Sequence, residues 1–167
     1  MARWYADLLR PKVAVSDAIK SKATELTAGL KTDDERVAAI YNYVATNIRY
    51  VSVSLGIGRF QPHAATEVLH NQYGDCKDKH TLLAAMLAAV DIKAEAVLIN
   101  AGRKLDPEVP SPFQFNHVIS AIKRGDSYLY ADTTAEVAPL GYLFEILRNK
   151  QGLLVSDSGS RLITTPT

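Results

Sequence analysis

The feature that most constrains this chain is a tight turn that leads directly into a long apolar helix. The turn occupies residues 73–75, and apolar residues recur at helical spacing from position 76 to about 90. Gly74 can adopt backbone angles closed to other residues, and the Asp75 carboxylate can cap the first helical turn. We therefore expect Cys76 at the first helical position, where free N–H groups and the helix dipole favour the reactive thiolate.

Cys76 is the only cysteine among 167 residues, so an internal disulfide framework is excluded. A lone cysteine in an apolar helix is often a small core residue. Leu83 and Leu87 share its helical face, so the sulfur points toward whatever the helix packs on. The helix alone therefore fits both a core thiol and a nucleophile at the floor of a cleft.

Helical patterns precede this stretch, and strand patterns follow it. Ser16 begins a helix predicted to reach residue 30, and Thr32 with Glu35 forms a capping box ahead of a helix over 33–49. Residues 101–112 contain three prolines and predict a long loop, either a lid or a solvated connector. Shorter elements are expected as a brief strand at 50–55, one or two helical turns at 64–70 and a buried strand at 92–100.

A β-hairpin is predicted downstream of the long loop. Strand patterns at 115–123 and 127–132 flank a turn led by Gly125, which is a favoured closure for antiparallel strands. A two-residue turn makes His117 and Asp132 diagonal neighbours on one face, and a four-residue loop keeps this register. A three-residue loop would place the two side chains on opposite faces.

A histidine beside a carboxylate is what a cysteine nucleophile requires. A histidine that acts as a base needs an acceptor that fixes its tautomer, and Asp132 would supply one to His117. Taken singly, His117 also fits a hydrogen-bonded structural histidine, and Asp132 a turn former at a strand end. The occurrence of both with Cys76 favours a shared site.

The charge and hydropathy of the chain argue against several classes of partner. Nineteen basic and eighteen acidic residues are scattered, so no basic stripe indicates nucleic acid or an anionic membrane. No apolar run approaches the roughly eighteen residues of a membrane span. The length predicts a single domain over 1–155, with 156–167 as a frayed end or a linker-like tail toward another domain of a longer protein.

Three ordered motifs resemble a known family. Cys76 lies in Gly-Asp-Cys-Lys-Asp-Lys, His117 follows 41 residues later in Phe-Asn-His, and Asp132 another 15 residues on in Leu-Tyr-Ala-Asp-Thr-Thr. Over about 33–152 the chain resembles bacterial members of the transglutaminase-like superfamily. The resemblance implies an α+β fold with a papain-like core, in which N-terminal helices and the cysteine-bearing helix pack on an antiparallel β-sheet.

The resemblance also implies a role for each site residue. Cys76 is the nucleophile, His117 the general base and Asp132 the group that orients the histidine. The Cys76 N–H and a second donor would hold the oxyanion, and Gln61 and Tyr50 are the candidates for that donor. No metal or other cofactor is implied; no acidic cluster resembles a calcium loop, although calcium dependence stays open.

The implied chemistry is acyl transfer from a peptide or protein amide through a thioester, to water or to an amine. Peptidase or amidase activity is favoured over cross-linking, because the chain shows no obvious element that would recognise a second substrate. Relatives often lie beside β-rich domains in larger exported, periplasmic or envelope-anchored bacterial proteins. The sequence itself leaves the compartment open.

Two other interpretations stay open. One is a non-catalytic module that uses this fold to bind a partner protein. The other is a zinc site, because His80 follows Cys76 by four residues on the same helical face, and His63, His70 or His117 would complete the ligand set. One thiolate with scattered histidines is a weak zinc pattern, so we expect His80 to face solvent or to cap the helix.

Overall fold

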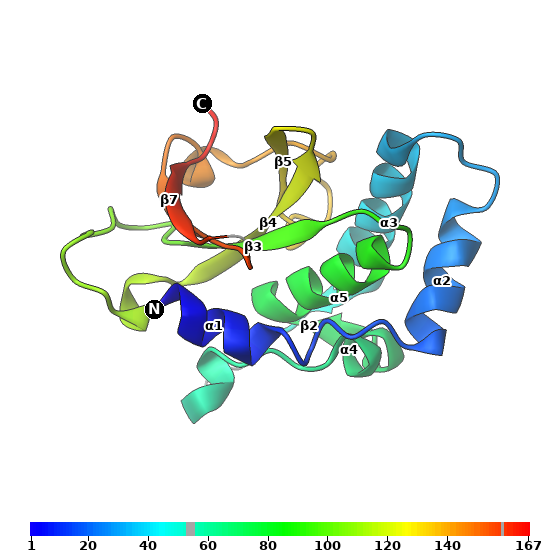
Figure 1. The fold of residues 1–167 in the computed structure, drawn as a ribbon, viewed down its shortest axis with the longest axis horizontal. Helices are drawn as coiled ribbons and strands as arrows, with labels where there is room; N and C mark the ends of the chain where they lie inside the picture. The colour runs from blue at the N-terminus through cyan, green and yellow to red at the C-terminus, as the bar shows by residue number, and fades with distance from the viewer. Residues whose placement is uncertain (53–55, 158) are drawn as a thin grey trace.

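The computed structural model describes residues 1–52, 56–157 and 159–167, which form a helical layer against a twisted sheet (Figure 1). Within these residues, no helix is long and apolar enough to cross a membrane. The helices are α1 (Ala2–Leu9), α2 (Asp17–Thr27), α3 (Asp33–Asn47), α4 (Ala65–Asn71) and α5 (Cys76–Ala88), with 3-10 turns η1 (Gly56–Arg59), η2 (Pro112–Gln114) and η3 (Glu145–Leu147).

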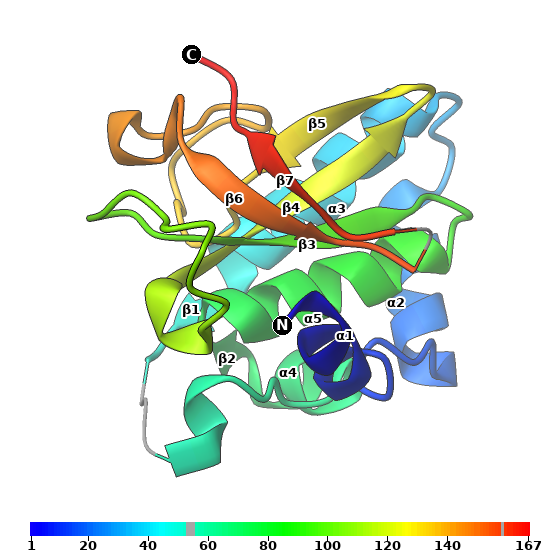
Figure 2. The same ribbon diagram turned by 60° about the vertical axis from the view of Figure 1, so that its left-hand side comes forward.

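The sheet is antiparallel, with strand order β5-β4-β3-β6-β7. A separate parallel pair, β1 with β2, lies directly before α5. Figure 2 shows α5 running along the sheet below β3, which matches the α+β arrangement predicted from the sequence. The strands are β1 (Arg49–Tyr50), β2 (Tyr73–Gly74), β3 (Ala94–Ile99), β4 (His117–Arg124), β5 (Ser127–Ala131), β6 (Gln151–Val155) and β7 (Arg161–Thr164).

The predicted capping residues begin helices α2 and α3. Ser16 Oγ accepts a hydrogen bond from the Ile19 N–H. At α3, Thr32 Oγ1 accepts from the Glu35 N–H at 3.2 Å, and Glu35 Oε2 accepts from the Thr32 N–H at 2.9 Å, so the capping box is confirmed. These bonds satisfy N–H groups that a helix start leaves without partners.

The hairpin has the predicted register. Arg124 pairs with Ser127, as a two-residue turn requires, and Gly125 takes a positive φ of 55°. The pairing continues back to Ser120 opposite Ala131. His117 and Asp132 therefore stand at the same end of the hairpin and on one face.

Helix α5 is buried on all sides rather than on one apolar face. Its predicted core residues Leu82, Leu83, Met86 and Leu87 are buried, and so is the polar run from position 77 to 81. This correction has a physical reason, because a buried polar group is tolerated when it has a partner. The partners come from α3, β4, the segment before α4, and α5 itself with its capping residue.

Lys79 and His80 illustrate this burial. Lys79 Nζ donates to the Ile48 carbonyl at 2.6 Å and to the Ala45 carbonyl at 3.1 Å, which satisfies the C-terminal end of α3. His80, expected at the surface or in a cap, is buried, and its Nδ1 lies 2.7 Å from Ser120 Oγ on β4. Burial lowers the pKa of Lys79 to about 8 and that of His80 to about 4.

Other differences lie at the ends of the domain. Residues 161–164, assigned to a linker-like tail, form β7 and pair with β6, so that part of the tail belongs to the sheet. This strand is short and mostly exposed, so its sequence shows no strand pattern. Backbone hydrogen bonds to β6 hold it in the sheet. Helix α1 was not predicted.

The strand expected at 50–55 is observed only as β1, and 53–55 lie outside the described residues.

Tyr41 connects α3 to the segment that follows β5. Its hydroxyl lies 3.0 Å from the Ala138 carbonyl oxygen and 3.2 Å from that of Asp132, and donates to both in a buried position. We expect Tyr41→Phe to lower the free energy of unfolding by about 1–3 kcal/mol, because two buried acceptors lose their donor. Urea denaturation measures this change. Tyr73→Phe, at a ring that is 46% exposed, is the matched control, and equal losses in both variants would contradict the prediction.

Candidate active site

Cys76 is the first residue of α5, and Asp75 caps the helix before it. Asp75 Oδ1 accepts from the N–H groups of Lys77 at 3.1 Å and Asp78 at 3.3 Å, while Asp78 Oδ2 accepts from the Asp75 N–H at 3.2 Å. This reciprocal cap uses the second and third N–H groups of the helix. The N–H of Cys76 itself has no partner in the helical ladder and is suited to bind an anionic oxygen.

Gly74 permits this turn because a side chain there would collide with Asp78. A Cβ on Gly74 would lie 2.6 Å from Asp78 Cβ, closer than real Cβ atoms approach. The Asp78 carboxylate also accepts from the backbone N–H of His63 at 2.8 Å and lies 3.1 Å from its Nδ1. The Gly-Asp-Cys order therefore fixes the sulfur at a helix end tied to the segment before α4.

His117 and Asp132 meet at the end of the hairpin. His117 Nε2 lies 2.9 Å from Asp132 Oδ2. The other carboxylate oxygen, Oδ1, accepts from the Thr134 N–H at 3.0 Å and from Thr134 Oγ1 at 2.7 Å, so the carboxylate is fixed from both sides. A carboxylate only accepts, so Nε2 carries the proton and Nδ1 is left to interact with the sulfur.

The pKa values of this pair move apart. Burial alone lowers the pKa of His117, but hydrogen bonds and charge from Asp132 and Cys76 outweigh it and raise the pKa to about 10. For Asp132, burial raises the pKa, and His117 and Thr134 outweigh that effect and lower it. The arrangement therefore stabilises an imidazolium between a carboxylate and the sulfur.

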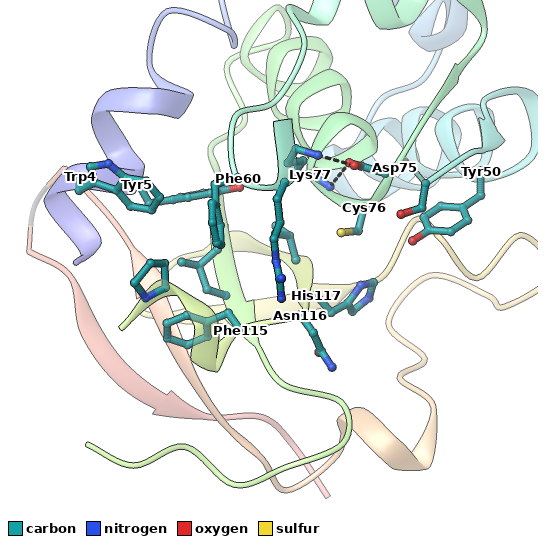
Figure 3. Close-up of a pocket in the computed structure, with 15 residues that line it drawn as sticks. Trp4, Tyr5, Tyr50, Phe60, Asp75, Cys76, Lys77, Phe115, Asn116 and His117 are labelled. Carbon is teal, nitrogen blue, oxygen red and sulfur yellow. Dashed lines mark hydrogen bonds and ion pairs between the residues drawn. The ribbon is translucent and has the colours of Figure 1, made fainter. Parts of the chain in front are cut away.

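Cys76 and His117 both line one cavity of about 360 Å³ between α1, α5 and the start of β4. Figure 3 shows the sulfur and the imidazole facing the same space, with Tyr50 on one side of Cys76 and Tyr5 on the other. Tyr50 is therefore in reach of the reacting centre. Gln61, the other predicted oxyanion donor, is described by the structure but is not among the residues that line the cavity.

Several cavity residues were not predicted from the sequence. Trp4 and Tyr5 come from α1, and Phe60 and Phe115 complete an aromatic wall. The available signal was the apolar spacing of positions 5, 6 and 9, which resembles a helix face but lacks a capping residue at its start. A helix this short is stabilised by packing, which the sequence does not display.

The alternative of a zinc site at Cys76 and His80 would require further ligands beside them. Within the described ranges, no three His, Cys, Asp or Glu side chains gather as a metal site would need. His80 turns its Nδ1 to Ser120 instead of toward a shared ligand set with Cys76. The absence of a cofactor requirement stays a prediction.

A model of the transglutaminase-like superfamily matches residues 20–135. The chain belongs to this superfamily. The family inferred from three sequence motifs is therefore confirmed, although no curated protein matches the sequence.

Two solved structures share the fold of this transglutaminase-like domain. A candidate protease from Parabacteroides distasonis ATCC 8503 has a TM-score of 0.73 and 18% sequence identity, over 98% of this chain and 31% of its own. A candidate cysteine protease from Cytophaga hutchinsonii has a TM-score of 0.57 and 17% identity, over 94% of this chain and 51% of its own. The chain thus spans about a third and about half of their lengths.

The charge state of His117 can be measured directly. We expect its ring protons to titrate near pH 10 in NMR spectra, while His80 stays neutral down to about pH 4. Asp132→Asn should lower the pKa of His117 by about 1–3 pH units, because the partner charge is lost. Titration of His117 at the ordinary value near 6.5 in the unmodified protein would refute this assignment.

The same shift has a consequence for stability. The pKa of His117 in the folded state lies above its unfolded value. Its contribution to the free energy of unfolding is therefore fully present below about pH 6.5. That contribution is lost as the pH rises from there toward about 10. Asp132→Asn should therefore flatten this part of the stability profile.

Gly74 offers a test of the turn. We expect Gly74→Ala to reduce both the thermal midpoint and the rate of Cys76 alkylation by iodoacetamide, because the added Cβ displaces Asp78 and with it the helix start. Gly58→Ala is the matched control, since a Cβ there meets nothing within 4 Å. Equal alkylation rates for the two variants would show that the close approach at Gly74 does not position the sulfur.

Proposed function

We propose that this protein is a cysteine-dependent acyl-transfer enzyme that cleaves amide or peptide bonds through a thioester. The observation that carries the proposal is that Cys76 and His117 line one cavity while Asp132 is hydrogen-bonded to His117. A thiol at a helix N-terminus, a histidine charged at neutral pH and a fixed carboxylate are the groups that such chemistry needs.

In the first half-reaction, Cys76 Sγ attacks the amide carbonyl carbon, and the carbonyl oxygen takes up the negative charge. The Cys76 N–H donates to this oxygen at the helix N-terminus. His117 then gives its Nδ1 proton to the nitrogen as the carbon–nitrogen bond breaks. The products are a free amine and a thioester on Cys76.

In the second half-reaction, water or an amine attacks the thioester carbonyl. Neutral His117 takes the proton of the attacking group on Nδ1, and the sulfur leaves as a thiolate. Asp132 holds the Nε2–H during both steps, so that Nδ1 stays aimed at the reacting atoms.

Tyr50 is the preferred second donor for the oxyanion. It lines the cavity, whereas Gln61 does not. Burial, followed by the nearby charge of Cys76, raises the pKa of the Tyr50 hydroxyl, which keeps it protonated and able to donate. A hydrogen bond from a donor in this position would become stronger as negative charge develops on the carbonyl oxygen.

Hydrolysis is favoured over transfer to an amine. Among the described residues lining the cavity, Asp75 is the sole carboxylate, and it is occupied by Lys77 Nζ and two backbone N–H groups. Arg59 and Lys77 add positive charge, so a protonated amine acceptor finds no free anionic partner there. The two structural neighbours, named as candidate proteases, agree with this choice.

The decisive measurement is turnover of acyl-donor peptides with and without a primary amine. We expect release of the leaving amine by the unmodified protein, loss of that activity in Cys76→Ala, and a decrease of about 10²–10⁴-fold in His117→Gln. His70→Gln, at an exposed histidine, is the matched control. An amine adduct as the main product would identify a transamidase, and equal rates for the unmodified protein and Cys76→Ala would indicate a binding module.

A further inference from the structure

Tyr5 presents a buried hydroxyl that the fold does not satisfy. Its side chain is 2% exposed, and its Oη has no hydrogen-bond partner among the described residues. A buried hydroxyl without a partner costs free energy, so such groups usually bind something when the protein works. The hydroxyl belongs to α1, which lies outside the region matched by the superfamily model.

The Tyr5 side chain forms part of the wall of the candidate active site. Tyr5 lines the same cavity as Cys76 and His117. Figure 3 shows its side chain reaching from α1 toward the start of α5, across Cys76 from Tyr50. Burial, then the charges of Cys76, Asp75 and Asp78, raises the pKa of this hydroxyl, so it stays a neutral donor.

The space around Tyr5 is aromatic. Trp4 meets Phe60 edge to face, with ring centroids 5.6 Å apart, and Phe60 meets Phe113 in the same way at 5.5 Å. Phe115 also lines the cavity, and the Arg59 guanidinium lies 5.6 Å from the Phe60 ring centroid. A hydrogen-bond donor beside an aromatic wall suits a ligand that carries a polar group next to a large apolar one.

We propose that α1 forms the acyl-donor subsite of this enzyme, where the Tyr5 hydroxyl donates to a backbone carbonyl of the bound peptide. The aromatic wall formed by Trp4, Phe60 and Phe115 then holds an aromatic or large aliphatic side chain of that peptide. This inference rests on the proposed acyl-transfer function and names its substrate class: apolar peptide amides.

Tyr5→Phe removes the hydroxyl and keeps the ring. We expect KM for an acetyl-Phe-Gly amide donor to rise about five- to tenfold with kcat unchanged, because one neutral hydrogen bond is lost in ground and transition states alike. The thermal midpoint should be unchanged or higher, since no bond inside the described protein is broken. Tyr142→Phe, at a ring that is 41% exposed and remote from the cavity, is the matched control.

A merely structural Tyr5 predicts the opposite result. The thermal midpoint would then fall in Tyr5→Phe, while KM would match that of the control. That outcome would overturn the subsite and leave the proposed acyl transfer intact, because turnover by Cys76 would persist.

Binding can be measured without catalysis. Trp4 is the only tryptophan of the chain and lies in the cavity wall, so its fluorescence reports occupancy. In Cys76→Ala, we expect the acetyl-Phe-Gly amide to bind at least about tenfold more tightly than its acetyl-Ala-Gly counterpart, because the aromatic side chain is buried. Adding Tyr5→Phe should weaken both peptides.

The turnover assay and the binding assay together distinguish failure of the acyl-transfer proposal from failure of the subsite proposal. Selective binding that depends on Tyr5, without turnover by the unmodified protein, would refute the acyl-transfer function and keep the subsite. Turnover with equal affinity for both peptides, or with no effect of Tyr5→Phe, would refute the subsite alone. Absence of both binding and turnover would overturn both.

Discussion

The burial of the polar first turn of α5 is the constraint on which the rest of the structure depends. Asp75 and Asp78 cap each other's backbone, and Lys79 closes the end of α3. A charged group inside a protein is tolerated only when such partners are present. The helix can therefore start at one position only, and that position places Cys76 at the cavity with its own N–H unused by the cap.

The sheet supplies the complementary half of the site. Asp132 follows β5, where Tyr41 holds its carbonyl and Thr134 holds its carboxylate. The imidazolium of His117 is stabilised because a fixed carboxylate and the sulfur face it from two sides, which outweighs the effect of burial. The helical layer thus contributes the sulfur, and the sheet contributes the imidazolium and its carboxylate.

Local rules predicted much of this site. With a two-residue turn led by Gly125, the pairing of His117 with Asp132 followed from counting residues, although a three-residue loop would have separated the two side chains. The positions of α1 and β7 and the burial of His80 did not follow, because their partners lie far away in the chain. Ser120, for example, pairs with His80 Nδ1 from 40 residues downstream, while the buried His80 Nε2 has no partner among the described residues. Sequence periodicity therefore underestimated the burial of α5 and missed the aromatic side of the cavity.

The division of the site between two layers also bears on how the protein matures. The sulfur belongs to a helix and its partners to a hairpin, so forming either element alone creates no reactive pair. In a compact state with native secondary structure but loose packing, Cys76 keeps its place at the helix N-terminus but lacks its imidazolium neighbour. Under the proposed function, the complete catalytic pair would therefore form only when the two layers dock.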